Sequence, residues 1–147
     1  MQLEMFIKLV LAGMSMSGQA AQPVAAAAPS PSDNLIVYRA NAEPVSWAPT
    51  VKVDGIKIVA LPNRHYTSTH VTRGVHTVTT SWPFISRQRS SLATITVSAE
   101  EPHFLIITGV SRYGGGYTMT LGSRIAEVDP TQARPEIASC CKFKAPK

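Results

Sequence analysis

Apolar and polar residues alternate along the chain in short runs, and the clearest alternation lies beside an Asp-Gly pair. Residues 51–53 alternate up to Asp54-Gly55, and the apolar run 56–61 follows. Asp-Gly tolerates the positive φ angles of a tight hairpin turn, and alternation with period two is typical of a half-buried strand. The pattern therefore predicts a β-hairpin.

Further short runs follow, separated by Gly, Pro, Asn and Asp. Many are rich in Thr and Val, which are branched at Cβ and suit a pleated surface. The predicted strands span about residues 35–38, 48–53, 56–61, 66–71, 75–82, 92–97, 104–107 and 117–128. Since no intervening segment is long enough for a crossover helix, we expect an all-β fold, an antiparallel β-sandwich of about 7–8 short strands.

Some runs also indicate where they lie in the sandwich. The continuous apolar runs 35–38 and 104–107 are typical of strands buried on both faces, and we place 104–107 in the centre of a sheet. In 92–97, alternation predicts Leu92 on one face and Ile95 on the other. Residues 132–139 could form a helical turn or more, and 142–147 are expected to be frayed.

The N-terminal residues have the pattern of an export signal. A short, weakly charged start precedes the apolar run 6–16, and Gly18 and Ala20 suit the positions before a cleavage site. Cleavage after Ala26 and an ordinary N-terminal helix are the alternatives. We expect a signal peptide at 1–20, an Ala/Pro/Ser-rich linker at 21–33, a sandwich domain at 34–130 and a tail at 131–147, in a periplasmic or secreted protein.

Composition narrows the class of partner. The chain has 147 residues, enough for one domain, and a net charge of +5. Its basic residues are scattered rather than gathered on a predicted helix or aromatic platform, so a nucleic-acid partner is not expected. We expect instead a protein or glycan partner in the cell envelope.

An ordered series of short motifs resembles a known family. The motif residues lie at 35–39, 48–55, 61–63, 66 and 73–77. They resemble the bacterial domain of unknown function 2846 family over about residues 34–128. The resemblance implies an exported β-domain, similar to small PEGA-type surface domains, with no established activity. Family members are often lipoproteins, but Met14 stands where the lipid-bearing Cys would be, and a thioether cannot be acylated in that way. No lipid anchor is expected. Arg73 replaces the usual Pro, and Gly74 still allows the turn.

Histidines supply one candidate metal site. If a three-residue loop joins the strands 66–71 and 75–82, His70 faces His76 and the two imidazoles could share a metal ion. With a two-residue loop the imidazoles fall on opposite faces. A structural role for His76 in the hairpin is the alternative.

The cysteines are adjacent, at Cys140 and Cys141. In an oxidising compartment they could form disulfides to another chain, giving a disulfide-linked dimer, or remain free thiols. A bridge between neighbours closes an eight-membered ring and is the less common third alternative.

Aromatic residues provide the remaining candidates. Trp47, Trp82, Tyr113 and Tyr117 could stack on a sugar ring, or could fill the ends of the sandwich. The sequence contains no Gly-x-Ser-x-Gly elbow and no carboxylate pair typical of a glycosidase. We therefore expect no enzyme activity and no cofactor. The sequence favours a non-catalytic binding domain of the bacterial envelope. A carbohydrate- or peptidoglycan-binding module and a small metal-binding protein are the alternatives.

Overall fold

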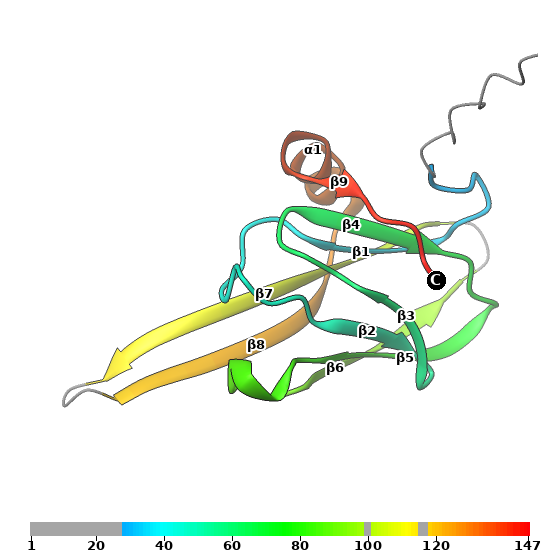
Figure 1. Ribbon diagram of the computed structural model, residues 1–147. Coiled ribbons are helices and arrows are strands. Elements are labelled where there is room, and N and C mark those ends of the chain that lie inside the picture. The colour runs from blue at the N-terminus through cyan, green and yellow to red at the C-terminus, as the bar shows by residue number, and fades with distance from the viewer. Residues whose placement is uncertain (1–27, 99–100, 115–117) are drawn as a thin grey trace, which may run out of the picture.

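The computed structural model describes residues 28–98, 101–114 and 118–147. Two β-sheets pack face to face, and one helix lies on the outside of the larger sheet (Figure 1). The elements are β1 Leu35–Arg39, β2 Thr50–Val53, β3 Ile56–Ala60, β4 His65–Thr69, β5 Gly74–Ser81, the 3-10 turn η1 Phe84–Ser86, β6 Ser91–Val97, β7 His103–Gly114, β8 Thr118–Val128, α1 Pro130–Cys140 and β9 Lys142–Phe143. The predicted all-β sandwich is confirmed.

Sheet A has five strands in the order β8-β7-β1-β4-β9, and it is mixed. β1 pairs antiparallel with β4 on one side and parallel with β7 on the other. β9 adds parallel to β4. The sequence indicated only antiparallel neighbours. β1 and β7 can pair in parallel because the long connection between them passes through the whole of the second sheet.

Sheet B has four strands in the order β3-β2-β5-β6, all antiparallel. The predicted hairpin at Asp54-Gly55 is confirmed. Both turn residues have positive φ, 49° for Asp54 and 82° for Gly55, as a tight primed turn requires. In β6 the predicted alternation also holds, since Leu92 is exposed and Ile95 is buried.

The expected hairpin between the strands near 66–71 and 75–82 does not form. β4 belongs to sheet A, whereas β5 belongs to sheet B. The residues around Gly74, whose φ is 134°, carry the chain from one layer to the other. A turn signal marks a change of direction, but it does not say whether the next strand joins the same sheet.

The main core lies between the two sheets. It is formed by buried aliphatic residues of both sheets, together with Trp82. Its buried members are Leu35, Val37, Val51, Val53, Val59, Leu61, Val71, Val78, Trp82, Ile95, Val97, Leu105, Ile107 and Ile125. The run 104–107, placed by its sequence inside a sheet, lies in the interior strand β7.

The C-terminal residues are part of the fold, so the prediction that 142–147 are frayed is wrong. β9 pairs with β4, and beyond it the amide of Lys144 donates to the carbonyl of Tyr66. The amide of Lys147 donates to the carbonyl of Ile58. In the part of the chain that the structure describes, no helix is long and apolar enough to cross a bilayer.

Candidate functional site

The outer face of sheet A carries a pocket of about 680 Å³. Its floor includes Ser68, Ile36 and Phe104, which are register neighbours on β4, β1 and β7. Residues 134–141 of α1 and its end form one wall, and residues 29–34 form another. Volumes of roughly 300–1,000 Å³ are typical of small-molecule sites. The size and the three-sided construction make this the candidate binding site, which we call the α1 pocket.

α1 is held over the sheet by its cap and by its apolar side. The Asp129 side chain accepts a hydrogen bond from the amide of Thr131 at 2.8 Å, and Pro130 occupies the first helical position. Ala133, with no exposed surface, packs against Tyr38 and Phe104. These contacts place the second half of the helix beside the pocket floor.

Tyr38 on β1 links sheet A to α1. Its ring is fully buried, and its hydroxyl donates to Glu136 Oε2 at 2.8 Å. Burial and, secondly, the Glu136 carboxylate hold the pKa of the Tyr38 phenol well above its usual range. The phenol therefore stays protonated and remains a donor to the helix.

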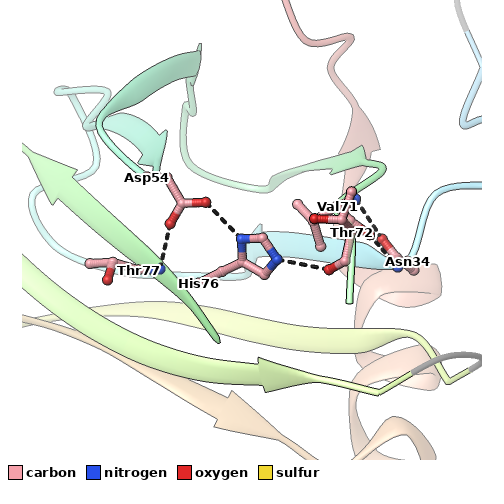
Figure 2. Close-up of polar contacts among 6 residues, drawn as sticks. All are labelled: Asn34, Asp54, Val71, Thr72, His76 and Thr77. Atoms are coloured by element: carbon pink, nitrogen blue, oxygen red, sulfur yellow. Dashed lines mark hydrogen bonds and ion pairs between the residues drawn. The ribbon is translucent and has the colours of Figure 1, made fainter. Parts of the chain in front are cut away.

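The segment 29–34 is attached to the sandwich by side chains. Asp33 Oδ2 accepts from the amide of Ser30 at 3.1 Å and from the hydroxyl of Ser68. Asn34 makes two bonds to the backbone of Val71, at 2.9 and 2.8 Å (Figure 2). The predicted linker 21–33 is thus fixed to sheet A at its end, because its last polar residues find partners on β4 and beyond it. Its residues 21–27, like the predicted signal peptide 1–20, lie outside the described residues.

Two oppositely charged side chains, Arg134 and Asp33, line the α1 pocket. The guanidinium of Arg134 lies over the ring of Phe104, 5.2 Å from its centre. Among the described residues no carboxylate lies within ion-pair distance of Arg134. Asp33 lines the same pocket, and both of its side-chain hydrogen bonds end on Oδ2. The pocket therefore offers a cation and a carboxylate oxygen that the described chain leaves without partners.

A second polar cluster joins sheet B to the crossing between the sheets (Figure 2). His76 on β5 lies between Asp54 and Thr72, with Nδ1 at 2.6 Å from Asp54 Oδ2 and Nε2 at 2.7 Å from the Thr72 carbonyl. The other oxygen of Asp54 accepts from the amide of Thr77 at 2.8 Å. Hydrogen bonding to Asp54 and then to Thr72 raises the pKa of His76. The Thr77 amide, followed by His76, lowers the pKa of Asp54.

This cluster does not provide the predicted metal site. His70 and His76 do not pair across a hairpin, because β4 and β5 lie in different sheets. Both ring nitrogens of His76 face acceptors, so its protonated form satisfies both and leaves no lone pair for a metal ion. Both histidines border a small pocket of about 220 Å³, but within the described ranges no group of three metal-binding side chains comes together. The alternative, a structural role for His76, fits its contacts.

The two tryptophans lie away from the α1 pocket and belong to the packing of the sandwich. Trp82 is 9% exposed, and the guanidinium of Arg39 lies 4.9 Å from the centre of its ring. Trp47 is half-buried against the core, and its carbonyl accepts from Arg39 at 2.7 Å. Stacking of Trp82 on a ligand is therefore contradicted by its burial. Tyr117 lies outside the described residues, as does the side chain of Tyr113, which belongs to β7.

Arg39 contacts both tryptophans. Its side chain is fully buried and donates to the carbonyls of Ala42, Pro44 and Trp47. Burial lowers the pKa of Arg39 to about 10, against a smaller opposing effect of Glu43, so it stays charged at neutral pH. The same loop crosses β7 at Gly109, where a Cβ would lie 1.5 Å from the Glu43 carbonyl oxygen.

The two cysteines are joined to each other by a disulfide between neighbours, at the junction of α1 and β9. Of the three alternatives that the sequence left open, the structure contains the least common. With both sulfurs in this bond, a disulfide to another chain through Cys140 or Cys141 requires that it first be opened. Cys141 also borders the α1 pocket.

Sequence reasoning missed the α1 pocket and its two charged residues. Asp33 was assigned to the linker, and Arg134 was one of many scattered basic residues. One local signal does mark the helix that forms a wall of the pocket, because Asp129-Pro130 is typical of a helix start. Comparison of the chain with family models, with curated proteins and with solved structures found no match.

Proposed function

We propose that the chain is a non-catalytic accessory domain of the bacterial cell envelope that binds a small ligand in the α1 pocket. The observation that carries this proposal is the pocket itself, built from sheet, helix and N-terminal segment on one face. Such concave sites, with an apolar floor and a few converging polar groups, are the default places for ligand binding. Membership of the family that the sequence resembles, and export by residues 1–20, remain parts of the proposal.

The chemistry of the lining favours binding over catalysis. The side chains that reach the pocket are suited to hold and orient a ligand: a guanidinium, a carboxylate, an imidazole, hydroxyls and aromatic rings. The histidine with the most specific contacts, His76, lies in the other sheet, and both of its nitrogens are engaged. A carbohydrate ligand is the second candidate, because Tyr66 lines the pocket beside Asp33 and Ser68, and a ring with polar neighbours is suited to a sugar.

A pocket-filling variant tests the proposed site. Ala138 is exposed on α1 and lines the pocket, so Ala138→Trp should fill it without disturbing the core. Gln132→Trp places the same side chain on an exposed position of α1 that does not line the pocket, and is the matched control. The probe is N-phenyl-1-naphthylamine, an uncharged fluorophore, with chitotriose as competitor.

We expect saturable fluorescence with the unmodified protein and with Gln132→Trp, and an affinity at least about tenfold weaker with Ala138→Trp, since a tenfold change corresponds to about 1.4 kcal/mol of binding. Displacement by chitotriose would favour the carbohydrate alternative. Equal binding by all three proteins would place the ligand elsewhere and remove the α1 pocket from the proposal.

Export is tested separately, by the intact mass of the protein recovered from host fractions. A mature chain beginning near Ala21, found in the periplasm or medium, is the expected result. Full-length protein in the cytosol would overturn the envelope assignment, and would leave the binding test unaffected.

A further inference from the structure

We propose that the α1 pocket takes a short peptide of two or three residues, recognised by its free amino and carboxyl ends. This inference rests on the proposed function, because it names the ligand class of the same pocket. It is carried by the placement of two charges at opposite ends of one floor.

The sheet register places the two charged groups over different strands. Ser68 and Phe104 are the partners of Ile36 on its two sides. Neighbouring strands lie about 4.8 Å apart, so the two residues are separated by roughly 10 Å. Asp33 is hydrogen-bonded to Ser68 at one end, and Arg134 lies over Phe104 at the other. The pocket is therefore polarised across the strands, with its carboxylate on the β4 side and its guanidinium on the β7 side.

Both charged groups keep capacity for a ligand. Oδ2 of Asp33 has two donors within the chain, whereas Oδ1 has none among the described residues and could accept from an ammonium group. The Arg134 guanidinium has five N–H donors and suits a bidentate carboxylate. Its face rests on Phe104, which leaves the N–H edges for a partner.

A short peptide in extended form fits this spacing. Each residue adds about 3.3–3.6 Å, so two or three residues separate an ammonium and a carboxylate by a length comparable to the roughly 10 Å between the backbones of Ser68 and Phe104. Between the charges, Ile36 below and Ile137 beside it offer an apolar surface for small side chains. His70 and Tyr66 are the remaining titratable groups of the lining, and Nδ1 of His70 lies 2.8 Å from the carbonyl oxygen of Ser32. A sugar has no need of two opposite charges, and a simple fatty or aromatic acid would use Arg134 alone.

Calorimetric titration with capped and uncapped alanine peptides tests the inference. Trialanine at neutral pH and low salt is compared with N-acetyl-trialanine, which lacks the ammonium group, and with trialanine amide, which lacks the carboxylate. We expect either cap to weaken binding at least about tenfold, as the loss of a charged hydrogen-bonded contact does. In a series from two to five residues, the affinity should be highest at two or three.

Variants that remove one charge each assign each end of the peptide to its residue. In Asp33→Asn, which keeps an acceptor for Ser30 and Ser68, N-acetylation should cause no further loss, while amidation still should. In Arg134→Gln, amidation should cause no further loss of affinity, while N-acetylation still should. Arg73→Gln is the matched control, because Arg73 is exposed and lies outside the pocket; it should bind all three peptides as the unmodified protein does.

The outcomes separate this inference from the function on which it rests. Equal affinity for capped and uncapped peptides, with binding of the uncharged fluorophore still lost in Ala138→Trp, would overturn recognition of the ends and keep the pocket. Chitotriose binding without peptide binding would overturn the peptide and favour a sugar. If neither the peptides nor the fluorophore bind, the proposed function itself fails.

Discussion

The two sheets differ in what covers their outer faces. On sheet A, α1 and the segment 29–34 lie over the strands, and Phe104 on that face is only 4% exposed. On sheet B none of the described elements covers the corresponding face at β6, where Leu92 is 62% exposed. The covered face contains a pocket with two charged groups that have no ion-pair partner among the described residues, whereas the open face exposes apolar side chains such as Leu92 and Val75. In this sandwich, the covering elements are what give one outer face a pocket.

The largest expected difference in the free energy of unfolding comes from truncating one apolar residue on the outer face of each sheet. Phe104→Ala removes a buried ring that supports α1, and should lower the free energy of unfolding by about 3–5 kcal/mol. Leu92→Ala should change it by less than about 0.5 kcal/mol, because the side chain is already in water. Chemical denaturation of both variants measures the difference. Similar losses of stability in Phe104→Ala and Leu92→Ala would mean that the outer face of sheet B is covered as well, and would contradict the difference between the two faces.

A smaller loss of stability is expected from removing the Tyr38 hydroxyl, which is hydrogen-bonded to Glu136 on α1. Tyr38→Phe keeps the buried ring and removes the bond to Glu136, so it should cost about 1 kcal/mol. Tyr66→Phe is the control, since the Tyr66 hydroxyl makes no hydrogen bond with the described residues, and it should leave stability unchanged. Hydrogen exchange of the α1 amides should accelerate in Tyr38→Phe alone. Unchanged exchange would show that apolar packing holds the helix without this bond.

The smallest expected change in stability comes from the His76–Asp54 pair of sheet B, and it depends on pH. The pKa of His76 is raised above its ordinary 6.5, so its contribution to stability is complete below that pH and is lost as the pH rises through the raised value. The pKa of Asp54 is lowered below its ordinary 3.8, so its contribution is present above 3.8 and is lost as the pH falls through the lowered value. The stability difference between the unmodified protein and His76→Ala should therefore be greatest between about pH 4 and 6.5 and shrink at higher pH.

Asp54→Asn provides the control for this pH dependence. In that background the carboxylate is absent, and the effect of His76→Ala should vary much less across the same pH range. A pH-independent difference in the unmodified background would show that His76 contributes by packing alone. Titration of the α1 pocket with trialanine should be unaffected by either substitution, because neither Asp54 nor His76 lines that pocket.

The sequence was most informative where one face of a strand meets water. The alternation in 92–97 correctly assigned Leu92 and Ile95 to opposite faces, and Asp54-Gly55 correctly marked a hairpin, because both patterns depend on residues close in the chain. It was least informative where distant segments meet. The turn near Gly74 could not show that the chain changes sheets, and the end of the chain contained no sign that β9 would pair with β4.

The candidate site illustrates the same limit. Asp33 and Arg134 lie about a hundred residues apart in the sequence, and neither belongs to a motif. They share a pocket only because β4, β1 and β7 are neighbours in sheet A. Local patterns by themselves determined that this chain forms strands, hairpins and a two-layer β-fold, since backbone preference and alternating hydrophobicity act over a few residues. Only the tertiary structure decided which strands pair, which face is covered and which charged side chains share a pocket. These features depend on contacts between segments whose separation along the chain leaves no periodic signal.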